Sequence, residues 1–300
     1  MHRRSALLLA ATMMLAAAAA AEPSRAGEIW TDNAADALAR AAREKKDLLV
    51  AFTGSDWTAS DPKLAAEVFG QAQFAAEAPG AFVLLRLDFP QKKPLDAALR
   101  RQNDEWKARF EVGGFPTVLL LDSAGKVYAQ TGYRQGGAAA YLKHLAELRA
   151  LREKRDADLA RAAAAAGVER ARLLDSAISS LGRQIAVDHY SGVVAEICML
   201  DGDGKAGLKP RYDAWAALRK ADRSAAANRT NEAVASLDEA VKLLGPTGEA
   251  TQEALYFKGF LCQCQNDKPG ARAAFEAAIK ALPNSRRARE CRMIIDRQLK

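Results

Sequence analysis

The sequence has 300 residues, of which 49% are hydrophobic and 27% are charged, a composition that excludes a disordered chain and is typical of globular proteins. This length predicts two domains. The formal net charge of +7 is spread along the chain and is densest at residues 286–297, where no aromatic residues interleave the arginines, so it predicts a solvated helix face and no nucleic-acid partner.

The N-terminus predicts a signal peptide over residues 1–21. Arg3 and Arg4 precede an apolar run of Leu, Met and Ala, and three alanines at 19–21 offer a small-residue cleavage site. No other segment is long and apolar enough to cross a bilayer. We therefore expect an extracytoplasmic protein, in a bacterial periplasm or secreted, with no integral membrane segment after cleavage.

Residues 29–150 alternate between helical and strand patterns. Helices are predicted at 31–46, 61–70 (with a continuation at 72–77), 95–110 and 138–151, and strands at 48–52, 82–87, 117–121 and 127–130. The last two strands surround a turn at 122–125 and form a hairpin. This order predicts an α/β domain with a mixed sheet flanked by helices.

Beyond residue 150 the strand patterns stop. We expect a helical linker at 151–167 and an all-α helical domain at 168–300. Its helices are predicted at 168–181, 185–200, 211–227, 231–244, 251–265, 270–282 and 285–299.

The C-terminal part contains an internal repeat. Small and aromatic residues recur at a fixed spacing at Gly259, Ala271, Phe275, Ala278 and Pro283. A weaker copy of these offsets lies upstream at Ala221, Ala233, Leu237 and Ala240. On these residues the segment 210–300 resembles tetratricopeptide repeats, whose stacked helix pairs form a groove for extended partners.

Two motifs in the α/β part belong together. Residues 52–57 read Phe-Thr-Gly-Ser-Asp-Trp and precede Thr58-Ala59-Ser60-Asp61, and Gly-Phe-Pro-Thr at 114–117 leads into a later strand. On these motifs the domain resembles the thioredoxin superfamily, in particular secreted bacterial members that carry Cys-x-x-Cys after the tryptophan. The resemblance implies a thioredoxin-like fold, an attacking and a resolving cysteine at positions 58 and 61, and a cis-proline at Pro116.

Both cysteine positions are degenerate, because they hold Thr58 and Asp61. A threonine hydroxyl stays protonated at neutral pH and forms no exchangeable bond with sulfur. The buried acid that the family often has before the phenylalanine is replaced by Ala51. Ser60 or Asp61 can instead cap the following helix. We therefore expect no catalytic residue at this site and no cofactor.

Peptide binding does not require the missing thiols. The resemblance implies that the backbone beside Pro116 is an open edge that pairs with an extended peptide. Phe115 and Thr117 flank this edge, and Trp57 is expected to supply apolar surface nearby. The alternative is that Pro116 only shapes its turn.

The four cysteines, Cys198, Cys262, Cys264 and Cys291, all lie beyond residue 150. In an oxidising compartment two of them can form a structural disulfide. Cys262 and Cys264 point to different sides of a predicted helix, so the expected pair is Cys264 or Cys262 with Cys291. The alternative is a set of buried, unpaired thiols.

No metal site is predicted. The three histidines lie far apart and lack zinc spacing. Asp201-Gly202-Asp203 begins like a calcium loop, but Lys205 and Tyr212 stand where the loop needs oxygen ligands, which favours a simple turn.

The sequence thus predicts an exported, redox-inactive binding protein with protein or peptide partners. The alternative function is a thiol–disulfide oxidoreductase or isomerase that uses one of the C-terminal cysteines. A third hypothesis is a permanent structural subunit of an envelope assembly. The oligomeric state is left open.

Overall fold

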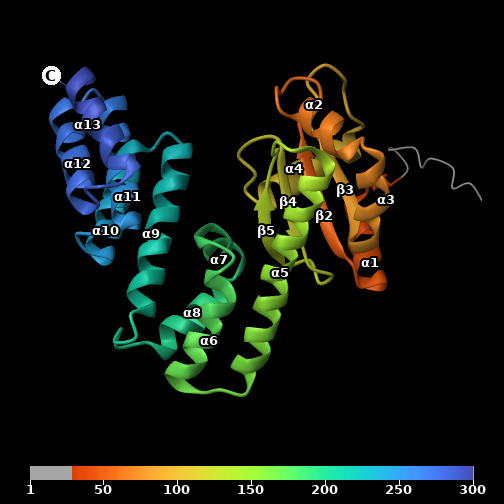
Figure 1. Cartoon of the computed structure of the whole chain (residues 1–300), viewed down its shortest axis with the longest axis horizontal. Coiled ribbons are helices and arrows are strands. Elements are labelled where there is room, and N and C mark those ends of the chain that lie inside the picture. Colours follow the sequence, from red (N-terminus) through yellow and green to blue (C-terminus); the bar gives the residue numbers. More distant parts are fainter. Residues whose placement is uncertain (1–28, 300) are drawn as a thin grey trace, which may run out of the picture.

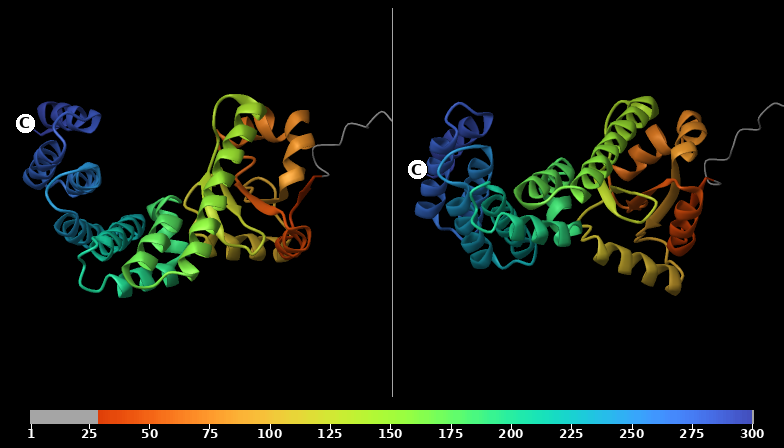
Figure 2. Two further views of the ribbon diagram at one scale, coloured as in Figure 1. Left: turned by 60° about the horizontal axis from the view of Figure 1, so that its bottom comes forward. Right: turned by 90° about the horizontal axis from the view of Figure 1, so that it is seen from below.

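The computed structural model describes residues 29–299, so the predicted signal peptide at 1–21 lies outside the described residues. An α/β domain comes first, and a series of helices follows it as an arm that curves away from the sheet (Figure 1). In both views of Figure 2 the last helices lie at the opposite end of the molecule from the first ones.

The α/β domain is built on five strands, β1 (Trp30–Thr31), β2 (Asp47–Thr53), β3 (Phe82–Asp88), β4 (Thr117–Leu121) and β5 (Val127–Thr131). Their order in the sheet is β1-β3-β2-β4-β5. Strands β1 and β2 run parallel to β3, whereas β4 is antiparallel to β2 and to β5. This arrangement confirms the predicted mixed sheet.

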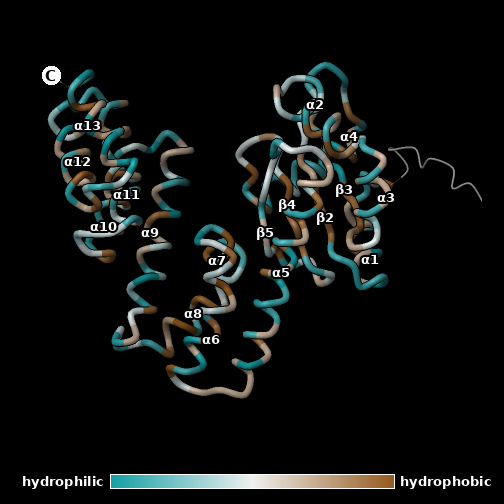
Figure 3. The backbone as a smooth tube through the Cα atoms, viewed as in Figure 1, coloured by the Kyte–Doolittle hydropathy of each residue, from teal (hydrophilic) through white to brown (hydrophobic). Residues whose placement is uncertain are grey.

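The central strands are apolar because both faces of the sheet are covered. Every residue of β2 and of β4 is buried, and the tube in Figure 3 shows hydrophobic residues along both. Figure 2 shows α4 on one side of the sheet and α3 and α5 on the other. The helices of this domain are α1 (Ala34–Glu44), α2 (Asp61–Leu64), the π-helical turn η1 (Ala65–Phe69), α3 (Ala72–Ala81), α4 (Ala97–Arg109) and α5 (Gly137–Ala163).

One difference from the predicted elements has a clear local cause. The helix predicted from residue 31 begins at Ala34, because Trp30 and Thr31 pair with β3 and Asn33 caps α1 through the backbone N–H of Asp36. The helix predicted at 138–151 and the linker after it form one helix, α5, which continues to Ala163.

The arm consists of α6 (Gly167–Ser179), α7 (Arg183–His189), α8 (Ser191–Leu200), α9 (Leu208–Ala226), α10 (Thr230–Leu244), α11 (Glu249–Cys264), α12 (Lys268–Ala281) and α13 (Arg286–Gln298). The helix predicted at 185–200 is divided at Tyr190, which lies between α7 and α8. No helix within residues 29–299 is long and apolar enough to span a membrane.

A buried arginine joins the arm to the sheet. Arg155 of α5 is 3% exposed and donates to Tyr190 Oη (2.6 Å) and to Asp122 Oδ2 (2.7 Å). The Tyr190 hydroxyl donates in turn to the carbonyl of Val127 (2.9 Å). Because Asp122 and Val127 flank the turn between β4 and β5, this chain of hydrogen bonds connects the first arm helices to the hairpin.

A second polar contact lies after α4. Arg223 of α9 donates to both carboxylate oxygens of Glu111 at 2.9 and 2.8 Å. The neighbouring Arg219 makes a bidentate contact with Asp188 of α7 at 3.1 and 2.5 Å. Together these ion pairs connect α7 and α9 to the loop that follows α4.

Candidate functional site

The turn after β2 is held by a carboxylate on the adjacent strand. Asp88, at the end of β3, accepts hydrogen bonds from Thr53 Oγ1 (2.8 Å), from the Ser55 N–H (3.0 Å) and from Ser55 Oγ (2.6 Å). Parallel strands end at the same edge of a sheet, so Asp88 lies beside the turn. Asp88 therefore holds in place the turn that precedes Thr58.

Thr58 and Asp61 form a reciprocal pair at the start of α2. The Thr58 hydroxyl donates to Asp61 Oδ2, and the Asp61 N–H donates to Thr58 Oγ1 at 3.2 Å. Asp61 Oδ2 also accepts the N–H of Gly54 at 2.9 Å, and Asp61 is 3% exposed. The two positions at which the thioredoxin resemblance implies cysteines thus hold a hydrogen-bonded pair whose aspartate is buried.

The expected helix cap by Ser60 or Asp61 is not formed. Ser60 makes no side-chain capping bond. The free N–H of Asp61 is bonded by Thr58, which lies three residues earlier and so reaches it with its side chain, while the Asp61 carboxylate turns back to Gly54.

Three aromatic rings, Trp57, Phe89 and Phe115, form a partly exposed surface that we call the aromatic platform. Trp57 is 44% exposed, and its indole N–H donates to the carbonyl of Phe89 at 2.8 Å. The Phe115 ring lies edge-on to Trp57 at 5.7 Å and 5.0 Å from Phe89, measured between centroids. Gly54 is required here, since a Cβ on it would lie 2.7 Å from the Trp57 ring.

The segment beside Pro116 leaves backbone groups open. The Phe115–Pro116 peptide bond is cis. Within residues 29–299, the N–H and C=O of Phe115 form no backbone hydrogen bond. Thr117 is 8% exposed and donates to the carbonyl of Gly114 at 2.7 Å. The backbone N–H and C=O of Phe115 are thus unpaired within the described residues, whereas the Thr117 side chain stabilises the loop.

Charged groups surround the platform. Lys107 of α4 places Nζ 5.4 Å from the centroid of Phe115 and 5.6 Å from that of Phe89. Asp56 accepts the backbone N–H groups of Gln91 (2.9 Å) and Lys92 (2.7 Å). The N–H of Gln91 is the main cause that lowers the pKa of Asp56. Asp56 therefore stays ionised and anchors the loop after β3.

The cysteines lie in the arm, and all four are free thiols. Cys262 and Cys291 belong to one buried cluster, while Cys264 is exposed. Burial raises the pKa of Cys198 and Cys262, and it raises that of Cys291 to about 11. Such thiols are protonated at neutral pH and are weak nucleophiles. The pairing of Cys264 or Cys262 with Cys291 stays a prediction.

Other titratable residues have structural contacts. Asp201 accepts the N–H groups of Ala206, Leu208 and Lys209 and so holds the start of α9. His144 Nε2 lies 3.0 Å from Thr131 Oγ1. In the described part of the chain, no three His, Cys, Asp or Glu side chains are grouped to hold a metal ion.

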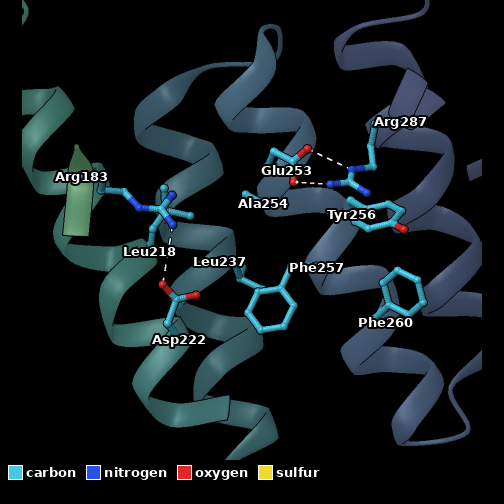
Figure 4. A pocket seen from close by; sticks show the side chains of 10 residues that line it. All are labelled: Arg183, Leu218, Asp222, Leu237, Glu253, Ala254, Tyr256, Phe257, Phe260 and Arg287. Atoms are coloured by element: carbon cyan, nitrogen blue, oxygen red, sulfur yellow. Dashed lines mark hydrogen bonds and ion pairs between the residues drawn. The ribbon is translucent and has the colours of Figure 1, made fainter. Parts of the chain in front are cut away.

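The arm contains a second candidate surface, a pocket of about 340 Å³. It is shown in Figure 4 and is lined by Arg183, Leu218, Asp222, Leu237, Glu253, Ala254, Tyr256, Phe257, Phe260 and Arg287. Arg183 pairs with Asp222 at 3.6 Å, and Arg287 pairs with Glu253 at 2.9 Å. No sequence motif indicates this pocket, because its residues come from five helices.

Comparison with known proteins supports the assignment of the first domain. A family model described as thioredoxin-like matches residues 29–123. The disulfide bond reductase DsbH of Chlamydia pneumoniae is 32% identical over 120 residues, which cover 40% of this chain and 72% of that protein. The thioredoxin-related protein DsbJ of the same organism is 29% identical over 93 residues, 31% of this chain and 27% of that protein.

A solved structure of a DsbH oxidoreductase has 32% identity and covers 41% of this chain and 85% of its own, with a TM-score of 0.39. The chain belongs to the thioredoxin-like family. The helical arm lies outside the segment that the family model matches.

Proposed function

We propose that this protein is an exported binding protein whose thioredoxin-like domain holds extended peptide segments and does not exchange disulfides. The observation that carries this proposal is the pair of Thr58 and Asp61. Each residue hydrogen-bonds the other at the helix start, and neither side chain contains sulfur. Fold alone does not determine activity, which depends on the groups at the site.

The edge at Phe115 supports peptide binding. Its open N–H and C=O groups can pair with an extended chain, as in β-strand addition. The aromatic platform beside it supplies apolar area at low conformational cost, because aromatic side chains have few rotatable bonds. We assign Trp57, Phe115 and Pro116 to this site, with Thr117 as a supporting residue.

We further propose that the arm is a scaffold of tetratricopeptide-like repeats, clearest at 210–300. The packing of α11 on α12 supports this, since a Cβ at Gly259 would lie 2.5 Å from the Phe275 ring, the close approach that the repeat pattern requires. The pocket in Figure 4 is then a second contact surface of the same scaffold. The proposed domains are 29–150 and 168–300, joined by the helical segment 151–167.

Export to an extracytoplasmic compartment, cleavage of residues 1–21 and a periplasmic or secreted location remain part of this proposal. They are supported by the charge and apolar pattern of the N-terminus.

A second candidate function is supported by the name of one relative. DsbH is described as a disulfide bond reductase, which favours an oxidoreductase or isomerase that uses a non-standard cysteine. Against it stand the burial of Cys262 and Cys291 and the raised pKa values of these two thiols, which leave Cys264 as the exposed thiol of α11. A reductase needs an accessible thiolate, and the α/β domain has no cysteine at all.

Binding of a permanently unfolded, carboxymethylated protein tests the proposed function. Fluorescence anisotropy with the mature protein is expected to show saturable binding, weakened about tenfold by Trp57→Ala, because exposed aromatic anchors dominate such contacts. The control is Met293→Ala, which removes an equally exposed apolar side chain from α13 and is expected to change nothing. Absence of binding, or equal affinity of the Trp57 variant, contradicts the proposal.

A further inference from the structure

We propose that the aromatic platform selects peptides in which an apolar side chain is flanked by acidic residues. This inference rests on the proposed peptide-binding function and names the class of ligand. It is based on the charges that surround the three rings and on how those charges are paired.

The apolar part of the ligand is defined by the platform itself. Trp57 is fixed by its hydrogen bond to the Phe89 carbonyl and by its edge contact with Phe115, yet 44% of it remains exposed. A rigid and exposed indole next to the unpaired backbone groups of Phe115 is suited to an apolar side chain of an extended peptide.

The acidic preference is argued first from Lys107. Its ammonium group lies within 5.6 Å of the centroids of both Phe89 and Phe115. Within residues 29–299 it has no carboxylate within ion-pair distance. A peptide carboxylate that reaches Lys107 must therefore lie beside the platform, where the rings partly shield the pair from water.

The loop after β3 adds two further cations. Lys92 and Lys93 are exposed, and the loop that carries them is anchored to the platform through Asp56. Asp56 offsets part of the charge of Lys92, and Asp104 shares the cavity beside Phe89 with Arg100. Lys107 is thus the cation that lies against the rings, and Lys93 is an exposed cation on the loop that carries Phe89.

These charges predict different affinities for acidic, neutral and basic peptides. A basic peptide is repelled by Lys107, and a neutral peptide leaves it unpaired. An acidic residue next to the apolar anchor gains an ion pair that the protein itself does not supply. The preference is electrostatic, so we expect it to weaken as the salt concentration rises.

Three short labelled peptides test the inference. They share a central phenylalanine and are flanked by aspartate, by asparagine or by lysine. We expect the aspartate peptide to bind the mature protein about fivefold tighter than the asparagine peptide for each ion pair formed, and the lysine peptide to bind weakest. Lys107→Gln is expected to remove most of this advantage, whereas Lys280→Gln, which removes an exposed lysine of α12, leaves it unchanged.

The outcomes separate this inference from the function on which it rests. Equal binding of the aspartate and asparagine peptides overturns the acidic preference and leaves peptide binding intact. Failure of all three peptides to bind overturns both. Thermal melting checks that Lys107→Gln is folded, and Lys93→Gln, which changes only an exposed loop residue, provides an independent variant with the same expected direction.

Discussion

Thr58 and Asp61 replace two sulfur atoms with a hydroxyl and a carboxylate that bond to each other. The hydroxyl serves as donor to Asp61 and as acceptor for the first free N–H of the helix. Asp61 is buried and also accepts from Gly54, so it fixes the turn and the helix together. At the scale of single residues, these bonds connect the turn after β2 to the start of α2.

This arrangement predicts opposite results for two replacements of Thr58. Thr58→Val keeps the shape but removes both hydrogen bonds, and it is expected to lower the free energy of unfolding by about 1–2 kcal/mol. Thr58→Ser keeps the hydroxyl and is expected to change it by less than about 0.5 kcal/mol. Urea unfolding followed by circular dichroism measures both. Equal stability of the two variants would show that the pair is unimportant.

At the scale of elements, packing in the arm depends on a glycine at a helix contact. Gly259 of α11 faces the Phe275 ring of α12. Gly259→Ala is expected to lower the free energy of unfolding by about 1–3 kcal/mol, because the ring has to move. In Gly192→Ala, on α8, the new Cβ meets no atom within 4 Å, and helix propensity predicts a gain of up to about 1 kcal/mol.

Thermal melting of these two variants distinguishes local packing from helix propensity. If both alanines raise the melting temperature, α11 and α12 do not pack as closely as the structure indicates.

The elements themselves were largely predictable from the sequence. The strand at 117–121 was found with its observed bounds, because five consecutive apolar or β-branched residues lie between a proline loop and a turn. Strand β1 was missed, since two residues carry no periodic signal and only pairing with β3 defines them. The continuation of α5 was expected as a helical segment over 151–167, and in the structure distant partners such as Tyr190 stabilise it.

The sequence predicted where the candidate site lies but only some of its residues. The sequence indicated Trp57 and Phe115 through the motifs that carry them. It did not indicate Phe89, Asp88 or Lys107, which lie on other elements and meet the turn only in the folded chain. These residues are far from the turn in the sequence, so no local pattern predicts their contacts with it.

At the scale of the whole molecule, the arm and the α/β domain share packing. One buried cluster extends from Ala34 to Tyr212 and includes residues of α6, α7 and α8. Arg155 also contacts Tyr190, which lies between α7 and α8, and Glu111 contacts Arg223 of α9. The first part of the arm is therefore held in a defined position against the β4–β5 hairpin.

Tyr190→Phe tests this connection. Loss of the hydroxyl leaves the buried Arg155 and the Val127 carbonyl each short of a partner, which is expected to cost about 1–3 kcal/mol. Hydrogen exchange is expected to become faster in α7 and in the β4–β5 hairpin. Tyr133→Phe, which removes a hydrogen bond to Glu67 at the surface, is the matched control and leaves exchange unchanged. Equal exchange in the two variants would mean that the junction does not depend on Tyr190.

The most direct measurement of the central claim is reduction of insulin disulfides by dithiothreitol in the presence of the mature protein. An established disulfide reductase serves as the positive control, and a variant with all four cysteines replaced by serine serves as the matched negative control. The account predicts that both the natural protein and the serine variant leave the rate at that of dithiothreitol alone. A faster rate with the natural protein that disappears in the serine variant would contradict it.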